Sequence, residues 1–332
     1  MRDLPVEFHH GDGYYDTTIR TATGDVTMRL RMTRVMAANG VSLPFVEKYP
    51  ICSLDDFEPV AQLFEHLEVV PRAQAYAAFH ERVGGRGGGS RGVAVANGPL
   101  GASPMHLLLH DLMVMENFFG MYKDEPQAMT KLAARMQPFY DSLLAASLAS
   151  DAEVIFWGAN YDHDTTWPPF FEQRIMPGLE HVRDRAHAAD KLLLTHTDGE
   201  SRGLLPLFRK CRFDVGESVC LKPMTSCTLR EFREGFGPDM TVFGAIPCVV
   251  LIDSCTSQRD YRSAHGPAVR RARKRPPPDS GRVRQCAARR QPGSPRSDQG
   301  LDRRIRIRRR RRRAVGRSGW SQGPNPNRQP TH

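Results

Sequence analysis

The sequence predicts an α/β protein of the TIM (β/α)8-barrel type that is incomplete at its carboxyl end. Short apolar runs that suit buried strands alternate with segments of helical apolar spacing, and each repeat takes about 25–40 residues. Polar and ionisable residues gather where the apolar runs end, as they do at the carboxyl ends of barrel strands. The composition then changes near residue 265, where the closing elements of a barrel are due.

The clearest strand lies within residues 191–199, where a leucine-rich run ends in His196, Asp198 and Gly199. A run of this kind is typical of a strand covered on both faces in a parallel sheet. His196 and Asp198 are two residues apart at its carboxyl end, where ligands bind in parallel sheets. A functional pair is the preferred interpretation, and an ordinary hydrogen-bonded loop is the alternative.

The other elements follow in chain order. The amino-terminal half is predicted to form a hairpin within residues 15–35 with its turn at 22–25, a helix from Ser53 to His66, a helix over 73–82, a strand over 93–99 and helices over 106–121 and 125–149. The second half is predicted to form strands over 153–157, 213–219 and 240–247 and helices over 170–189, 201–212 and 229–236.

Further polar residues stand at the ends of these strands. Asn97 ends one strand, and Glu217 lies near the end of another. Between them, residues 158–169 form a strand-end loop that carries Asp162, His163 and Asp164 beside Tyr161 and Trp167. Two carboxylates and an imidazole can ligate a metal or move protons, although turns are also rich in Asp. We predict Asp162 and Asp164 as catalytic residues and Asn97, Tyr161 and His163 as substrate-binding residues.

Residues 84–92 are rich in glycine, which invites comparison with a phosphate-binding loop. The segment lacks the Lys-Ser/Thr pair of a P-loop and precedes a predicted strand. We therefore predict a connection from helix to strand.

The charge divides the chain into two regions, 1–264 and 265–332. The second region holds 21 of the 47 Lys and Arg residues and 3 of the 37 Asp and Glu residues, so its charge is +18 and that of the first region is −8. The second region contains no Glu, Phe, Tyr or Met and cannot bury a core. It is either a disordered basic arm that binds nucleic acid or an acidic partner, or out-of-frame translation of a GC-rich gene. The abrupt change favours the second interpretation.

The seven cysteines include no Cys-x-x-Cys pair, and the amino terminus lacks a charged-then-apolar leader. These features predict a reduced, cytoplasmic setting. No apolar run approaches the roughly 20 residues of a membrane span, so no membrane partner is expected.

Several segments resemble, in the same order, the motifs of the uroporphyrinogen decarboxylase superfamily. They are residues 47–57, 93–99, 157–172, 196–199 and 243–247, and the likeness covers roughly residues 15–262. The resemblance implies a TIM barrel that acts on a small-molecule substrate, in a group that holds porphyrin-pathway decarboxylases and corrinoid- or coenzyme M-linked methyltransferases.

Within that superfamily the chain is more similar to the methyltransferases. Their His-x-Cys-Gly motif helps to bind a zinc ion that activates a methyl acceptor; here Asp198 replaces the cysteine, after His196 and before Gly199. An Asp oxygen can ligate zinc, and Glu217 could add a third ligand from the next strand end. The resemblance therefore implies a zinc site of His196, Asp198 and Glu217, and a corrinoid carried by a partner protein.

The alternative is decarboxylation in porphyrin biosynthesis. The decarboxylases hold their substrate's carboxylates with an arginine-rich amino-terminal loop, and no matching segment is present; Arg29, Arg31 and Arg34 are patterned as an exposed strand. Two further hypotheses remain. The truncated barrel is inactive, or the chain binds nucleic acid if the basic tail is genuine.

Overall fold

The computed structural model describes residues 3–82 and 93–247, and all statements below concern this part of the chain. These residues belong to one compact unit, Met1–Ser280. The glycine-rich segment 84–92 and the basic tail 265–332, with the predictions made for them, lie outside the described residues.

The amino-terminal part forms a four-stranded antiparallel sheet. Its strands are β1 (Val6–Gly11), β2 (Tyr14–Thr21), β3 (Gly24–Arg31) and β4 (Phe45–Lys48), in that order. The turn predicted at residues 22–25 joins β2 to β3. The outer strands β1 and β4 were not predicted.

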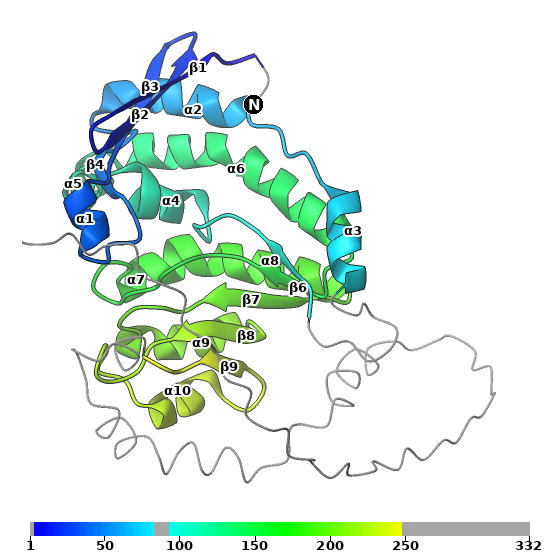
Figure 1. Ribbon diagram of the computed structural model, residues 1–332. Helices are drawn as coiled ribbons and strands as arrows, with labels where there is room; N and C mark the ends of the chain where they lie inside the picture. Colours follow the sequence, from blue (N-terminus) through cyan, green and yellow to red (C-terminus); the bar gives the residue numbers. More distant parts are fainter. Residues whose placement is uncertain (1–2, 83–92, 248–332) are drawn as a thin grey trace, which may run out of the picture. The chain divides into compact units, whose positions relative to one another are not determined.

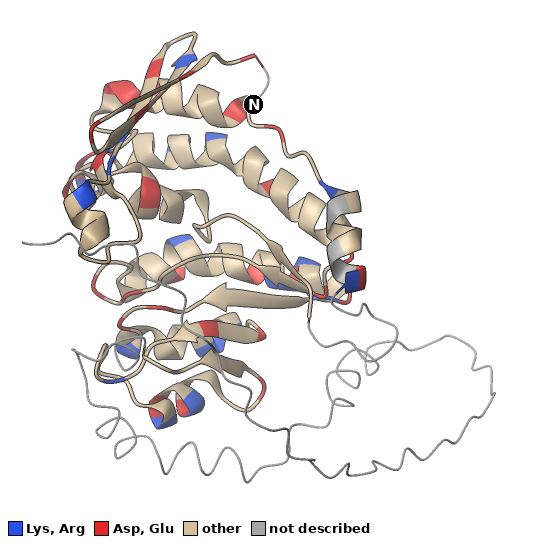
Figure 2. Cartoon of the chain, in the orientation of Figure 1, with Lys and Arg blue, Asp and Glu red and all other residues tan. Residues whose placement is uncertain are grey.

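Acidic and basic residues occur along these strands (Figure 2), and the register places Asp16, Arg29 and Arg31 on one face of the sheet. Arg29 donates to both oxygens of Asp16 across β2 and β3, and Arg31 pairs with Glu47 of β4 at 2.7 Å. The charges of this face are thus paired across strands, which stabilises the register.

Four helical segments follow β3 in the chain. They are α1 (Arg34–Ala38), which precedes β4, and η1 (Leu54–Asp56), α2 (Phe57–Glu65) and α3 (Ala73–Arg82), which follow it. Helix α2 lies between β3 and the long helix α6 (Pro126–Ala149) (Figure 1) and buries Val60, Ala61 and Phe64. The carboxylate of Asp56 accepts the backbone N–H groups of Cys52 and Ser53 at 2.8 Å, which fixes the start of this helical segment.

The remaining strands form one five-stranded parallel sheet. They are β5 (Val95–Asn97), β6 (Val154–Phe156), β7 (Leu192–His196), β8 (Val215–Val219) and β9 (Thr241–Gly244). Each strand lies within a segment predicted as a strand. Their order in the sheet is their order in the chain, and every pair is parallel. The predicted α/β class with a parallel sheet is confirmed.

Helices connect consecutive strands of this sheet. Strand β5 is followed by α4 (Pro104–Leu107), the π-helical turn η2 (Leu108–Leu112), α5 (Met115–Asp124) and α6. Strand β6 is followed by α7 (Pro168–Phe170), the π-helical turn η3 (Phe171–Ile175) and α8 (Met176–Ala188). Strand β7 is followed by η4 (Arg202–Leu204) and α9 (Leu205–Cys211), and β8 is followed by α10 (Leu229–Phe236).

The continuous helix predicted over residues 106–121 is wrong. The chain becomes extended at Met113, which forms a parallel bridge with Ile51, and the N–H of Ile51 donates to the carbonyl of Leu112 at 3.0 Å. A pairing with a distant segment therefore overrides the helical pattern here.

The two faces of the parallel sheet differ in burial. Along β7, Leu193 and Thr195 are buried, whereas Leu192, Leu194 and His196 are partly exposed. The covering helices follow the order of the strands, since α6 contacts α8, α8 contacts α9 and α9 contacts α10 (Figure 1). The partly exposed face carries His196 and Glu217 at its carboxyl end.

In residues 3–82 and 93–247, no helix combines the length and the apolar character needed to cross a membrane.

Candidate functional site

The pairing of β7 with β8 brings two of the predicted metal ligands together. His196 and Glu217 are opposite each other in the parallel register, and Nδ1 of His196 lies 2.5 Å from Oε2 of Glu217. Asp198 follows on the loop after β7, with its Oδ2 4.0 Å from Nε2 of His196. The imidazole therefore stands between two carboxylates, one at each ring nitrogen.

Glu217 is held in place by an irregularity of β8. The register with β9 shifts between Gly216 and Val219, and Ser218 has a φ of 54°, in the left-handed region. Because of this conformation, the hydroxyl of Ser218 donates to Oε1 of Glu217 at 2.6 Å, leaving Oε2 for the imidazole. Bulges of this kind are frequent next to active sites, where they change the direction of a side chain.

The contact with Glu217 decides how His196 can act. A carboxylate at Nδ1 favours the proton there and leaves the lone pair on Nε2, the nitrogen that faces Asp198. Glu217, predicted as a third ligand, thus occupies the position of an orienting residue. Among the described residues, no three His, Cys, Asp or Glu side chains form a ready metal cage. His196 and Asp198 can still bind an ion together, or exchange a proton.

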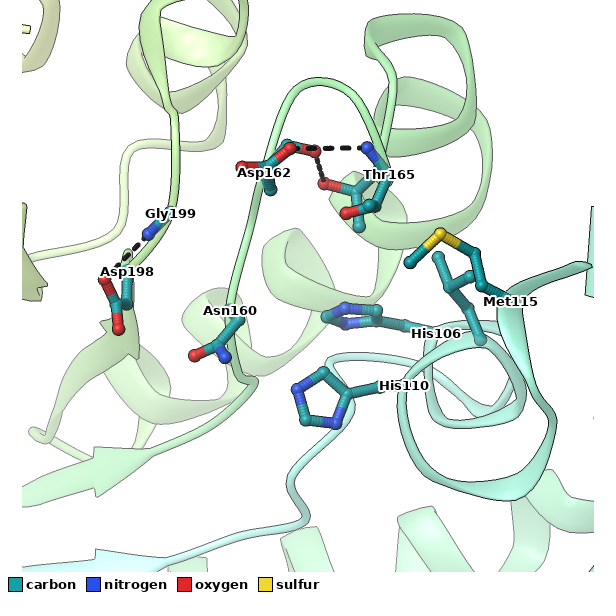
Figure 3. A pocket seen from close by; sticks show the side chains of 10 residues that line it. His106, His110, Met115, Asn160, Asp162, Thr165, Asp198 and Gly199 are labelled. Atoms are coloured by element: carbon teal, nitrogen blue, oxygen red, sulfur yellow. Dashed lines mark hydrogen bonds between the residues drawn. The ribbon is translucent and has the colours of Figure 1, made fainter. Parts of the chain in front are cut away.

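A pocket of about 360 Å³ lies beside this cluster. It is lined by side chains from three segments that follow consecutive strands, among them His106, His110, Asn160, Asp162 and Asp198. In Figure 3 the rings of His106 and His110 extend toward the loop that carries Asn160 and Asp162, and Asp198 belongs to the next loop. Asp198 therefore connects the pocket with the His196 cluster.

Asp162 shapes the loop after β6. Its Oδ1 accepts the N–H of Asp164 at 2.9 Å, and its Oδ2 accepts the N–H of Glu200 at 3.0 Å. The first bond closes a turn within the loop, and the second ties this loop to the one after β7. Asp162 also lines the pocket. Its position is therefore compatible with both predicted roles, as a turn residue and as a residue that contacts a substrate.

The neighbours of Asp162 take other positions. The side chain of Asp164 is 80% exposed and lies 3.2 Å from Nε2 of His163. Nδ1 of His163 bonds the carbonyl of Glu200 at 3.0 Å. Both residues lie outside the pocket lining, and their predicted roles rest on the sequence.

The other two predicted substrate-binding residues lie apart. Tyr161 is fully buried, and its hydroxyl lies 2.7 Å from Oγ1 of Thr195. Burial raises the pKa of its phenol above the usual range, while the bond to Thr195 lowers it, so the hydroxyl stays neutral. Asn97 ends β5 and is exposed. Neither residue is part of the pocket lining.

His106 is a pocket residue that the sequence analysis missed. It is completely buried, and its Nδ1 accepts the N–H of Ala102 at 3.1 Å, which places the proton on Nε2. Nε2 has no hydrogen-bond partner among the described residues. Burial and, after it, the nearby His110 lower the pKa of His106 to about 3, and the backbone of Asn160 opposes the shift. His106 is therefore a neutral donor at ordinary pH.

His110 was missed as well. It lies one π-helical turn from His106, with the ring centroids 5.9 Å apart, and its Nδ1 is 3.0 Å from Oδ2 of Asp111. The signal in the sequence was the His-x-x-x-His spacing, which puts two imidazoles on one side of a helix. π-Helical turns are frequent at functional sites.

The fold and this site define an α/β protein with ionisable groups gathered at the carboxyl ends of its parallel strands. No protein-family model matches the chain. No curated protein matches it either.

Proposed function

We propose that this chain is an enzyme of the uroporphyrinogen decarboxylase superfamily that catalyses metal-assisted methyl transfer, with a corrinoid or a thiol as acceptor. The observation that carries the proposal is His196, held at a strand end by Glu217 and facing Asp198 at the edge of a pocket. This is the position at which barrel enzymes place their catalytic groups.

The sheet supports a barrel-type fold. Strands in sequential order, with a row of helices in the same order, are expected for part of a (β/α) barrel, whereas a doubly wound sheet reverses its strand order at a switch point. The partly exposed residues Phe156, Leu194 and Val215 are register neighbours on one face of the sheet. In our proposal this face is the interior of a barrel that residues 93–247 build only in part.

In this proposal two side chains at the strand ends would hold a zinc ion, one fewer than the three protein ligands of a usual catalytic zinc site. Nε2 of His196 and Oδ2 of Asp198 are 4.0 Å apart, close to the roughly 3.4 Å that separates two ligands of a tetrahedral zinc. Nitrogen and carboxylate oxygen are both accepted zinc donors. His196 and Asp198 would hold the ion, and Glu217 would orient His196, as carboxylates next to metal-binding histidines do.

The chain's own residues would divide the remaining tasks. Zinc, when bound, would favour the ionised form of a thiol or hydroxyl acceptor. Glu217 keeps the proton of His196 on Nδ1, and Asp162 ties together the two loops that border the pocket. Asp162 also presents a carboxylate to the substrate, and a partner protein would carry the corrinoid.

Methyl transfer from methylcobalamin to a small thiol tests this function. We expect the purified wild-type protein, supplied with zinc, to convert methylcobalamin and the thiol into cob(I)alamin and the thioether, with the thiol proton released to solvent. The His196→Ala variant should lose about 100-fold or more in rate, because a ligand is removed.

The matched control is His187→Ala. His187 also pairs with a carboxylate, Oδ2 of Asp214, at 2.9 Å, but it lies in the last turn of α8, before β7, away from the strand ends that carry the site. Its removal should leave the rate unchanged. Equal loss in both variants, or turnover that does not depend on His196, would refute the assignment.

The runner-up is decarboxylation of a porphyrinogen, which needs no metal. The contact of Glu217 with Nδ1 is compatible with this chemistry, because it also prepares His196 for proton transfer. A role in binding nucleic acid rests only on residues 265–332, and inactivity of a truncated barrel rests on the same segment.

A further inference from the structure

The charge of the pocket restricts its ligand, and this inference rests on the proposed function because it concerns the same site. Asp162 and Asp198 contribute two carboxylates to the lining, and none of the described lining residues is a lysine or an arginine. An anionic ligand would enter this pocket against two negative charges and would have no cationic side chain to bind.

The histidines do not reverse this charge. His106 is buried and neutral. A proton on His110 would be matched by Asp111, which lies 3.0 Å from its Nδ1, and a proton on His196 by Glu217. Neither of these two matching carboxylates lines the pocket. Asp162 and Asp198 therefore keep their negative charges at the pocket, although backbone N–H groups bond both oxygens of Asp162 and Oδ1 of Asp198.

A bound zinc ion would not reverse the charge either. Its two positive charges would be offset by Asp198, by Glu217 beside His196, and by an ionised thiol acceptor. Asp162 would then still line the pocket as a negative charge that is bonded by backbone N–H groups and not by a cationic side chain.

A second observation specifies another part of the ligand. Nε2 of His106 carries a proton, because Nδ1 accepts from Ala102, and it makes no hydrogen bond of normal geometry among the described residues, although the backbone of Asn160 interacts with the ring. An unpartnered buried donor is costly, and a ligand oxygen would relieve this cost. Leu109 and Met115 add apolar surface to the same lining, which suits methyl groups.

We propose that the pocket binds a small organic cation that also carries an uncharged oxygen, such as an amino alcohol with a methylated ammonium group. The ammonium group would lie toward Asp162, and also toward Asp198 where no metal is bound, and the oxygen would lie toward His106. The volume of about 360 Å³ is at the lower end for ligand pockets, which agrees with a ligand of this size.

Calorimetric titration with three ligands of equal shape tests the proposal. They are choline, the neutral alcohol in which carbon replaces the ammonium nitrogen, and the carboxylate of the same carbon skeleton. We expect choline to bind at least about tenfold more tightly than the neutral alcohol, and the carboxylate to bind most weakly. The titrations are run on the wild-type protein with zinc and with a chelator, so that the result does not depend on a bound metal.

Two variants locate the effect. Asp198→Asn should reduce the preference for choline to about threefold or less, since the amide keeps the shape but not the charge. Asp184→Asn is the control, because Asp184 lies on α8 with its side chain 70% exposed.

Equal affinity for the three ligands, tightest binding of the carboxylate, or no binding of choline would overturn the proposal. The wild-type titrations decide this even if Asp198→Asn does not fold. A preference for choline without methyl transfer would instead refute the proposed function and leave the ligand assignment standing.

Discussion

Acidification from pH 6.5 to pH 4 should lower the free energy of unfolding of the wild-type protein by roughly 3 kcal/mol more than that of a His106→Asn variant. The reason is the buried, neutral imidazole. The pKa of His106 is about 3 in the folded protein, against 6.5 for an ordinary histidine. Between these values the unfolded chain binds a proton that the folded protein does not bind.

The sign follows from this difference in proton binding. The folded-state pKa is lowered, so the contribution of His106 to stability is complete above pH 6.5 and is lost as the pH falls toward 3. In the His106→Asn variant, the amide oxygen of the introduced side chain can still accept the N–H of Ala102, but the amide does not titrate.

Urea unfolding of both proteins at several pH values provides the measurement. Carboxylates titrate in both proteins, so the difference between the two curves isolates His106. Parallel curves would show that His106 takes up its proton over the same pH range in the folded protein as in the unfolded chain.

Replacement of Gly158 by alanine should destabilise the protein by about 3 kcal/mol or more. Gly158 follows β6 with a φ of 95°, a conformation that L-residues rarely adopt. A Cβ at this position would lie 2.0 Å from the hydroxyl oxygen of Tyr161, 3.0 Å from Oγ1 of Thr195 and 3.2 Å from Cβ of Ala102. Tyr161 is fully buried and cannot move aside.

Thermal unfolding followed by circular dichroism measures this effect. Gly120→Ala is the control, because Gly120 lies within α5 and a Cβ there would meet no described atom within 4 Å. That variant should be slightly more stable than the wild-type protein, by about 0.5–1 kcal/mol. Equal melting temperatures of Gly158→Ala and the wild-type protein would contradict the packing described for this loop.

The parallel strands could be predicted because each is a short apolar run that ends in polar or turn residues. Residues 191–199 show this most clearly, with β7 ending at His196. The sequence also placed Glu217 at the strand end next to that of His196, since the ends of adjacent parallel strands meet at one edge of the sheet, but the register that sets the two residues opposite each other was not predicted. For this reason His196, Asp198 and Glu217 could be predicted to lie close together.

Other features depend on contacts between distant segments and could not be predicted. The break at Met113 results from its bridge to Ile51, and the ring of Tyr161 is buried against His106, Phe171 and Phe208. The spacing of His106 and His110 was visible in the sequence, but the apolar helical pattern around them favoured a core helix, and the π-helical turn that follows His106 was not predicted. The contact of Glu217 with Nδ1 of His196 depends on side-chain orientation, which the sequence pattern does not determine.

The zinc content of the purified protein after dialysis against a zinc buffer tests the central claim, that Glu217 orients His196 to bind a metal with Asp198. The account predicts about one zinc ion per chain in the wild-type protein and in His187→Ala, none in His196→Ala, and a zinc affinity lowered about 10- to 100-fold in Glu217→Gln. A folded wild-type protein that retains no zinc, or zinc that persists in His196→Ala, would contradict it.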